Sequence, residues 1–230
     1  MHVGLIPDGN RRFMSKKSIK NLFDSYNMGI TRFFDFLEWC MKDGVDQVTI
    51  YALSTENLDN RSNTEIETLF KVFSDQAKKA INDKRIHDSK ISVKVCGSRD
   101  TLINKTNNKE LANQLVENLN NLEEATKDYS NLRLNLAIAY GGRQEILNAA
   151  EAVSTSGEEF SEENFRKHLW IPDYPEVVIR TSEERLSNFL TWQSAYSEIY
   201  FVDKLWQEFE HQDLSHILDD YNQRDRRFGR

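Results

Sequence analysis

The sequence predicts an α/β protein with a mostly parallel central sheet flanked by helices. Short apolar runs alternate with longer stretches in which apolar residues recur at helical spacing, and this alternation is typical of a parallel sheet covered on both faces. The 230 residues include only three prolines, and the chain shows no internal repeat, low-complexity segment or Pro/Ser-rich linker. We therefore expect one domain over residues 1–230.

Six apolar runs are the expected strands, at residues 2–6, 47–53, 91–95, 132–138, 177–179 and 198–202. Five stretches with a period of three to four residues are the expected helices, at 26–41, 66–81, 111–122, 146–153 and 214–221. Capping signals support these assignments, because Ser62 and Glu65 fit a capping box, Gly44 follows the first long helix, and Ser161 fits a helix start.

The composition narrows the class of protein. Hydrophobic residues make up 39% of the chain, with 13 Phe, which is enough for a folded core. The formal charge of −7 argues against a general nucleic-acid binder, although a local arginine cluster can still bind an anion. Cys40 and Cys96 lie in apolar runs and form no CxxC pair, so we expect two reduced core thiols.

The sequence also indicates where in the cell the protein is found. No signal peptide precedes His2, and no apolar stretch approaches the ~18 residues that a membrane span requires. The chain starts one residue before the first expected strand, so we expect no N-terminal membrane-docking segment. We expect a cytoplasmic protein with at most peripheral contact with a membrane.

Polar residues follow four of the expected strands at the point where each strand ends. They are Asp8, Gly9, Asn10 and Arg12 after the first strand, Ser54, Thr55, Glu56, Asn57 and Arg61 after the second, Gly141, Gly142 and Arg143 after the fourth, and Arg180, Thr181, Arg185, Ser187 and Asn188 after the fifth. Ligands of open α/β sheets bind beyond the carboxyl ends of the strands, so we expect these groups to converge on one edge.

This edge has the composition of a diphosphate site. Arginine suits bidentate contact with phosphate oxygens, and glycine at a helix start lets backbone N–H groups approach an anion. Asp8 is a carboxylate in this basic set, and its natural use is to hold a Mg²⁺ that also binds diphosphate. Taken singly, residues 7–10 are a good turn, Gly141 begins a helix and Arg180 is a solvated charge. The functional interpretation depends on their shared position.

Several other sites are disfavoured by the sequence. There is neither a GxGxxG after a strand nor a GxxxxGK[ST] motif, which weighs against dinucleotide and P-loop binding. No His/Cys cluster has the spacing of a zinc site. Of the five histidines, His2 is the candidate for the site.

Five segments carry a more specific signal, in order and over nearly the whole chain: HVGLIPDGNRRF (2–13), YALSTENLDNR (51–61), LNLAIAYGGRQEI (134–146), IRTSEERLSNFLTWQSAYSEIYF (179–201) and RDRRFG (224–229). Together they closely resemble the cis-prenyltransferases, the group of undecaprenyl and dehydrodolichyl diphosphate synthases. The corresponding family patterns are Asp-Gly-Asn-x-Arg, Ser-x-Glu-Asn, Tyr-Gly-Gly-Arg, Arg-x-Ser-Asn-Phe and a terminal Arg-x-Gly.

The resemblance implies a homodimeric α/β fold with a hydrophobic tunnel. It implies Mg²⁺-dependent condensation of isopentenyl diphosphate with an allylic prenyl diphosphate, which gives a cis-polyprenyl diphosphate. Asp8 and Asn57 would be catalytic, and Asp8 and Glu198 would hold Mg²⁺. The substrate-binding residues would be Gly9, Asn10, Arg11, Arg12, Phe13, Ser54, Glu56, Arg61, Arg180, Arg185, Ser187, Arg227 and Gly229. Of these, Arg227 and Gly229 would close over the site of the partner subunit.

The stretch 16–29 departs from the family pattern. A typical member has Gly-His on the helix after the first motif, whereas here Ser25 and Tyr26 occupy that region and Asp24 adds a negative charge. A similar loss occurs in divergent relatives that join two dimethylallyl units head to middle. An irregular, lavandulyl-type or short-chain coupling enzyme is therefore an alternative, behind ordinary elongation, because Asn57 and Glu198 match the family.

Two alternatives come from other classes of protein. One is a non-catalytic subunit of a heteromeric prenyltransferase, although such subunits usually lack the carboxylate that Asp8 supplies. The other is a nucleotide-binding or phosphatase-like α/β protein, against which the absence of a Gly-rich fingerprint speaks. A thermal shift with diphosphates, but not with NAD or ATP, would separate the enzyme from the second alternative.

Overall fold

The computed structural model describes residues 1–224, and these residues contain a six-stranded sheet. The strands are β1 (His2–Ile6), β2 (Gln47–Ser54), β3 (Ile91–Cys96), β4 (Leu132–Tyr140), β5 (Val177–Thr181) and β6 (Glu198–Val202). Their order across the sheet is β3-β4-β2-β1-β5-β6, and every neighbouring pair is parallel. The expected α/β class is confirmed, and the described sheet is parallel throughout.

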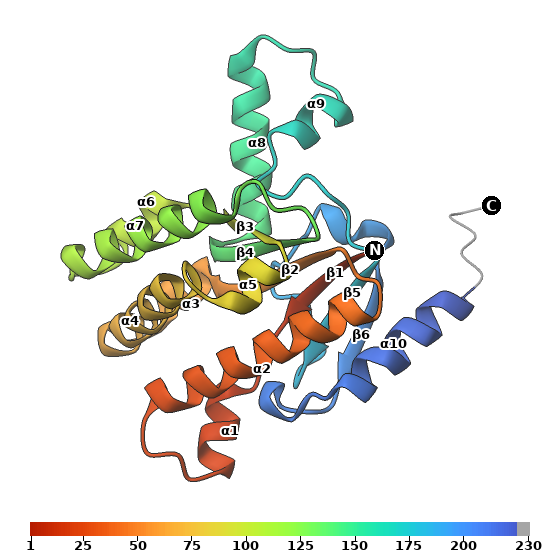
Figure 1. Ribbon diagram of the computed structural model, residues 1–230. Helices are drawn as coiled ribbons and strands as arrows, with labels where there is room; N and C mark the ends of the chain where they lie inside the picture. Colours follow the sequence, from red (N-terminus) through yellow and green to blue (C-terminus); the bar gives the residue numbers. More distant parts are fainter. Residues whose placement is uncertain (225–230) are drawn as a thin grey trace.

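Helices connect the strands and cover the sheet (Figure 1). They are α1 (Asn10–Lys16), α2 (Leu22–Lys42), α3 (Thr55–Asn60), α4 (Asn63–Ala80), α5 (Lys84–Asp88), α6 (Arg99–Asn104), α7 (Lys109–Thr126), α8 (Gly142–Ser156), α9 (Glu162–Lys167) and α10 (His211–Gln223), with short 3₁₀ turns η1 (Gln193–Tyr196) and η2 (Trp206–Glu208). The side chain of Ser62 accepts from Glu65 N and that of Ser161 from Asn164 N, so both caps are present. The reciprocal half of the expected capping box is not, because the Glu65 carboxylate contacts Tyr26 and Arg61.

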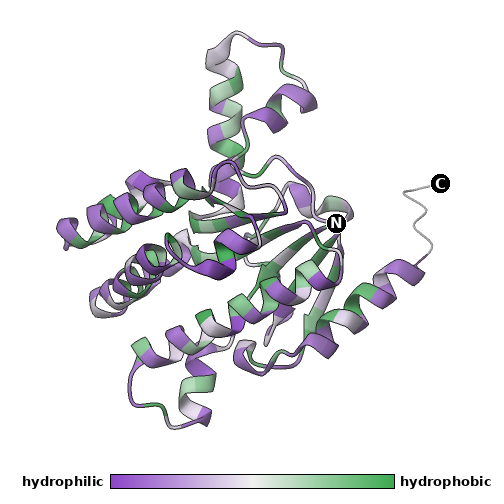
Figure 2. Cartoon of the chain, in the orientation of Figure 1, coloured by the Kyte–Doolittle hydropathy of each residue, from purple (hydrophilic) through white to green (hydrophobic). Residues whose placement is uncertain are grey.

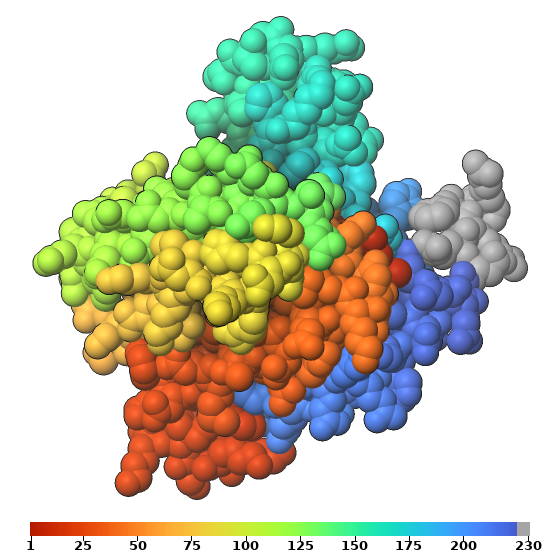
Figure 3. Space-filling view, viewed as in Figure 1, coloured from red at the N-terminus to blue at the C-terminus, as the bar shows by residue number. Residues whose placement is uncertain are grey.

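The core lies between the sheet and the helices. The strands are the most apolar segments in Figure 2, while the helices are polar on their outer faces. In Figure 3, α2, α5, α7 and α10 close over the side of the sheet that faces the viewer. Both thiols are in the core and unpaired, as predicted, and burial raises the pKa of Cys96 to about 12.

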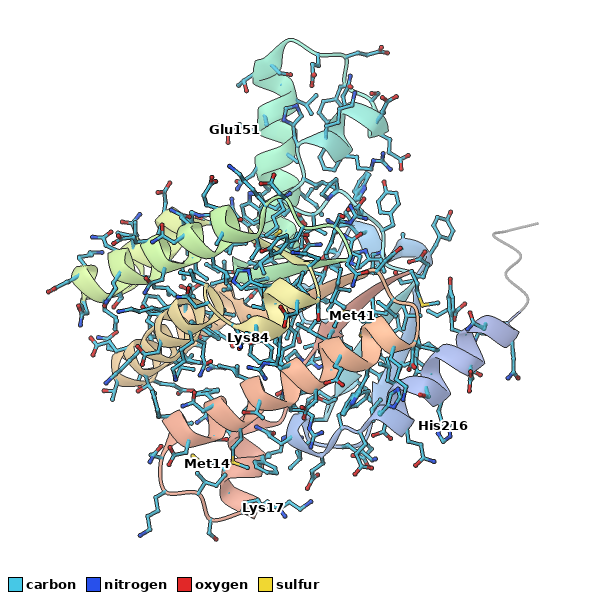
Figure 4. All side chains as sticks on the ribbon, viewed as in Figure 1. Met14, Lys17, Met41, Lys84, Glu151 and His216 are labelled. Carbon is cyan, nitrogen blue, oxygen red and sulfur yellow. The ribbon has the colours of Figure 1, made fainter. Side chains whose placement is uncertain are left out.

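Helices α8 and α9 project from the body of the molecule (Figures 1 and 3). The labelled Glu151 lies on this arm in Figure 4, whereas His216 lies on α10 at the other side of the molecule. Among residues 1–224, no helix combines the length and the apolar character needed to cross a membrane.

The strand order reverses beside β1. The chain passes from β1 toward β2 and β4 on one side, and it later returns to place β5 on the other side. The connections after β1 and β5 therefore leave in opposite directions, and a crevice opens between their carboxyl ends, which is where open α/β sheets bind ligands. The polar segments after β1 and β5 meet at this crevice.

Candidate active site

Asp8 and the end of β5 form the centre of the crevice. The parallel pairing places Ile6 beside Arg180, so the residues that follow β1 meet those that end β5. The Thr181 hydroxyl donates to the Asp8 carbonyl at 2.8 Å and accepts from the Asp8 N–H at 2.9 Å. The Arg180 Nη2 donates to Asp8 Oδ2 at 2.8 Å, which joins the two strand ends by an ion pair.

Arg180 is a cation held inside the protein. Its side chain is only 4% exposed, and Nη1 donates to Ser187 Oγ at 2.7 Å and to the Arg185 carbonyl. Its buried Nε has no hydrogen-bond partner among residues 1–224. A buried guanidinium with an unused donor is costly unless an acceptor approaches, so this side chain is suited to binding an anionic ligand.

Helix α1 begins at Asn10, two residues after Asp8. Gly9 caps it with φ of +106°, a conformation that favours glycine, and its N–H donates to Asp8 Oδ1 at 2.6 Å. The first N–H groups of a helix have no partner inside the helix, and Asn10, Arg11 and Arg12 line the cavity described below. The Asn10 side chain is already engaged, because Oδ1 accepts from Gln207 at 2.7 Å. Its side-chain amide also donates to the Pro7 carbonyl, so the backbone N–H of Asn10, and not its side chain, is available to a ligand.

A hydrogen-bonded cluster holds the residues that follow β2. The Ser54 hydroxyl caps α3 by accepting from Asn57 N at 3.0 Å. The Asn57 Oδ1 accepts from Arg61 Nη2 at 2.7 Å, and Arg61 Nη1 donates to the Tyr26 hydroxyl, also at 2.7 Å. Glu65 closes the cluster, since it lies 3.3 Å from Arg61 Nη1 and accepts from Tyr26 at 3.2 Å. Burial raises the pKa of Tyr26, so this hydroxyl stays a donor.

These polar groups surround the mouth of an apolar cavity of about 500 Å³. Its wall combines the inner faces of α2, α4 and α7 with side chains of β2, β3 and β4. The apolar lining includes Ile30, Phe33, Phe34, Leu37, Ile50, Leu69, Phe73, Ala77, Ala80, Val93, Leu119, Leu122 and Leu134. A ligand that fits this site has an anionic head and an apolar tail.

Most of the predicted site residues come together at the mouth of the cavity: Asp8, Gly9, Asn10, Arg11, Arg12, Ser54, Asn57, Arg61, Arg180, Arg185 and Ser187 all line it. Phe13 does not, because it is the buried residue of α1. Glu56 is outside the lining as well, and it accepts from Asn188 Nδ2 at 2.7 Å. Arg227 and Gly229 lie outside the described residues.

Glu198, the other expected metal ligand, lies away from Asp8 within one chain. It is the first residue of β6 and pairs with Val177, whereas Asp8 contacts Thr181 at the other end of β5. Four residues of strand separate these positions, or about 13 Å. Glu198 instead forms an ion pair with Arg224. A single chain therefore does not place Glu198 and Asp8 on the same metal ion.

The geometry corrects two expectations, that the start of α8 binds an anion and that His2 belongs to the site. The start of α8 is not open to an anion, because Gly142 N donates to the Asn188 carbonyl and Arg143 N to its side chain. Gly142 is needed for this approach, since a Cβ there would lie 2.4 Å from Thr191 Oγ1. His2 lies at the amino end of β1, on the opposite edge of the sheet, where Nε2 contacts Thr49 Oγ1 at 2.7 Å.

The sequence did not point to several residues that organise this site. In the sequence, Tyr26 stands out only as a departure from a family pattern, and Glu65 only as part of a helix cap. Gln207 contacts Asn10 from 197 positions away in the chain. Glu65 had one usable signal, because an Arg–Glu pair four residues apart contacts across one helical turn.

The parallel sheet, the basic mouth and the apolar cavity define an α/β protein that binds an anionic group attached to an apolar chain. Residues 6–229 match the family model described as "Putative undecaprenyl diphosphate synthase". The chain belongs to this family of prenyl diphosphate synthases and is a prenyltransferase.

The relatives cover the whole chain. The chain is 42% identical to a protein of Pyrobaculum aerophilum, over 100% of this chain and 95% of that one, and 41% identical to one of Methanopyrus kandleri, over 100% and 84%. Both are named tritrans,polycis-undecaprenyl-diphosphate synthase (geranylgeranyl-diphosphate specific).

Two crystal structures are similar in fold. One is a probable undecaprenyl diphosphate synthase from Campylobacter jejuni, with a TM-score of 0.80 and 28% identity. The other is lavandulyl diphosphate synthase from Lavandula x intermedia in complex with dimethylallyl diphosphate, with a TM-score of 0.86 and 27% identity. Each comparison covers 100% of this chain and 98% of the other.

Proposed function

We propose that this protein condenses isopentenyl diphosphate with geranylgeranyl diphosphate and extends the product by cis additions. The observation that carries the proposal is the buried, incompletely satisfied Arg180 beside Asp8 at the mouth of a 500 Å³ apolar cavity. The cavity reaches from α2 to α7 and β3, which suits a tail of several isoprene units. The names of relatives at 41–42% identity support geranylgeranyl diphosphate as the allylic substrate.

The residues at the mouth divide into two groups around Asp8. Arg180, Arg185 and Ser187 come from the end of β5 and suit the diphosphate of isopentenyl diphosphate. The first turn of α1, with Arg12, suits the allylic diphosphate, because its N–H groups and guanidinium stabilise the charge that grows on a leaving diphosphate. These groups are preorganised by the contacts among the strand ends.

The reaction breaks the bond between the allylic carbon and its diphosphate oxygen. The alkene of isopentenyl diphosphate forms the new carbon–carbon bond, and a proton is then lost to give the cis double bond. Asn57 is the side chain that we place beside the reacting carbons. Its Oδ1 is held by Arg61, which leaves the amide N–H₂ to donate to a substrate.

Mg²⁺ fits the donor set at Asp8. Residues 1–224 contain no group of three or more His, Cys, Asp or Glu that could hold a metal ion alone, but Mg²⁺ usually binds one or two carboxylates together with substrate phosphates. Asp8 is 37% exposed and has the required oxygens. When bound, the ion would neutralise charge on the diphosphate.

We extend the proposal to a homodimer. Within one chain, Glu198 and Arg224 lie away from the cavity, and β6 is an edge strand that exposes Ile199 and Phe201. Exposed apolar edge strands are usually covered. Light scattering after size-exclusion chromatography tests this, with a mass of twice 26.9 kDa expected and a monomer contradicting it.

Irregular coupling of two dimethylallyl units is the second candidate. Two observations favour it, the TM-score of 0.86 to lavandulyl diphosphate synthase and the presence of Tyr26 at the mouth. The depth of the apolar cavity favours elongation over this alternative. A non-catalytic subunit is a third candidate, against which the placement of Asp8 at the centre of the crevice speaks.

The test is an incubation of the purified protein with Mg²⁺ and labelled isopentenyl diphosphate. Parallel reactions contain dimethylallyl, geranyl, farnesyl or geranylgeranyl diphosphate, and one contains dimethylallyl diphosphate alone. Mass spectrometry of the products should show chain growth that is fastest on geranylgeranyl diphosphate. A short product from dimethylallyl diphosphate alone would establish irregular coupling, and no product in any reaction would favour the partner-dependent subunit.

A further inference from the structure

Glu183 lies between two arginines at the mouth of the cavity. Its Oε1 is 2.8 Å from Arg12 Nη2, and its Oε2 is 2.7 Å from Arg185 Nη1. Arg12 belongs to α1, and Arg185 to the loop after β5, so one carboxylate bridges two elements that both line the cavity mouth. Arg12 is further held by a bond of 3.0 Å from Nη1 to the Ser182 carbonyl.

We infer that Glu183 is an internal competitor for diphosphate, an affinity-determining residue that occupies Arg12 and Arg185 when no substrate is bound. The inference rests on the proposed function, because it requires that these arginines bind phosphate oxygens. A carboxylate offers a guanidinium anionic oxygen acceptors, as a phosphate does. Diphosphate must therefore displace Glu183, and Glu183 returns as inorganic diphosphate leaves.

The exposure of the three side chains makes this exchange possible. Arg12 and Arg185 are 50% and 62% exposed, and Glu183 is 29% exposed. Ion pairs that contact water are individually weak, so a ligand with more negative charge and more acceptor oxygens can replace the carboxylate. The pair between Asp8 and the 4%-exposed Arg180 is different, because it is anchored inside the protein.

The neighbouring Glu184 is a matched control. It is exposed, and among residues 1–224 it has no hydrogen bond or ion pair comparable to those of Glu183. The variants Glu183→Gln and Glu184→Gln change the net charge equally and at adjacent positions. A difference between them therefore reports the specific contacts of Glu183 and not the overall field of the protein.

The experiment is isothermal titration calorimetry of the full chain with inorganic pyrophosphate and Mg²⁺ at fixed ionic strength. Glu183→Gln should bind pyrophosphate about three- to tenfold more tightly than the wild type, which is the range expected when two exposed ion pairs no longer compete. Glu184→Gln should stay within about twofold of the wild type. Product inhibition by pyrophosphate should strengthen in Glu183→Gln by a similar factor.

A double-mutant cycle shows whether the effect acts through the arginines. In an Arg185→Gln background, the gain from Glu183→Gln should shrink, because one of its two contacts is already missing. Circular dichroism checks that each variant is folded, and a variant of Arg185 that does not fold can be replaced by Arg12→Gln.

The outcomes separate this inference from the proposed function. Equal tightening in both glutamine variants, or weaker binding in Glu183→Gln, would overturn the inference while leaving a diphosphate site in place. Weaker binding in Glu183→Gln would mean that Glu183 holds the two arginines in a binding conformation. Absence of pyrophosphate binding in the wild type and both variants would overturn the proposed function, and this inference with it.

Discussion

Asp8 and Arg180 form the ion pair at the centre of the crevice, and the proposed chemistry depends on both. Asp8→Asn keeps the size of the side chain and an acceptor for Gly9 N, but it removes the negative charge. We predict that kcat falls about 100-fold, since the variant loses a metal ligand and a group that organises the charge at the leaving diphosphate. Steady-state kinetics with isopentenyl diphosphate measures this loss.

The control for Asp8 is Asp219→Asn, which makes the same change at an exposed position of α10. Its kcat should equal that of the wild type. Thermal unfolding of the Asp8 variant shows whether the buried Arg180 can lose its partner without loss of the fold. An Asp8→Asn protein with wild-type kcat would remove Asp8 from the mechanism.

A second prediction concerns the hydroxyl group of Tyr26. Tyr26→Phe removes the acceptor for Arg61 and the donor to Glu65, and so loosens the residue that orients Asn57. We predict a fall in kcat of about three- to tenfold, as expected for the loss of one or two partly buried hydrogen bonds. The KM for isopentenyl diphosphate should change by less than twofold.

The matched control for this variant is Tyr174→Phe, because the Tyr174 hydroxyl also contacts a glutamate, Glu162, but does so on the surface. Kinetics of the two variants should differ only in kcat. If Tyr26→Phe raises KM and leaves kcat unchanged, Tyr26 contacts the substrate and does not position Asn57.

The individual residues show how much of the site a sequence can predict. Asp8, Asn57 and Arg180 were predicted because each follows a buried strand, and parallel strands end at one edge. The partners of these residues were not predicted, since hydrogen bonds such as that of Gln207 to Asn10 depend on how distant loops pack. The metal role of Glu198 stays a prediction, because the register of β6 places this residue at the amino end of its strand within one chain.

Whole elements were predicted best where they are long. The periods of α2, α4, α7 and α10 extend over several turns, and β1 and β5 are buried throughout, whereas β6 is partly exposed. The short helices α1, α3, α5 and α6 were missed, because five to seven residues contain too few turns to show a period. Two of these belong to the site, because α1 begins two residues after Asp8 and α3 contains Asn57.

The close packing of α2 against α1 gives a prediction about the position of a whole helix. A Cβ at Gly29 would lie 2.8 Å from Asn10 Oδ1 and 3.4 Å from Trp206 Cδ1. Gly29→Ala should therefore push α1 away from its position and lower the free energy of unfolding by about 1–3 kcal/mol. Activity should fall as well, because the proposed function places the allylic diphosphate at the first turn of α1.

The comparison for Gly29 is Met28→Ala, at an exposed position of the same helix. Urea unfolding and kinetics should show little change for this control. An unchanged activity in a destabilised Gly29→Ala protein would mean that the position of α1 does not matter for the reaction.

The molecule as a whole should lose stability in mild acid through His2. Burial lowers the pKa of His2 to about 4, so the unfolded chain binds the proton near pH 6.5 while the folded protein still excludes it. This contribution to stability is complete above pH 6.5 and is lost as the pH falls toward 4. Between pH 7 and pH 4.5 we expect it to remove about 2 kcal/mol from the free energy of unfolding.

The variant His2→Gln tests this contribution, because an amide can still donate to Thr49 but does not titrate. Urea unfolding at pH 7 and pH 4.5 should show a smaller loss of stability in the variant than in the wild type. Equal losses in the two proteins would assign the acid sensitivity to other groups.

The size of the whole cavity should set the length of the product. Ala80 lines the apolar interior between α4 and the sheet and is 6% exposed, so a larger side chain there takes volume that a growing chain would fill. We predict that Ala80→Leu shifts the product distribution toward shorter chains while the first condensation continues, because the residues at the mouth are untouched.

Ala125→Leu, at an exposed position of α7, is the control and should give the wild-type products. Mass spectrometry of the products measures both. A slower first condensation with an unchanged length distribution would mean that Ala80 lies along the entry path of the substrate and that another part of the wall limits chain growth.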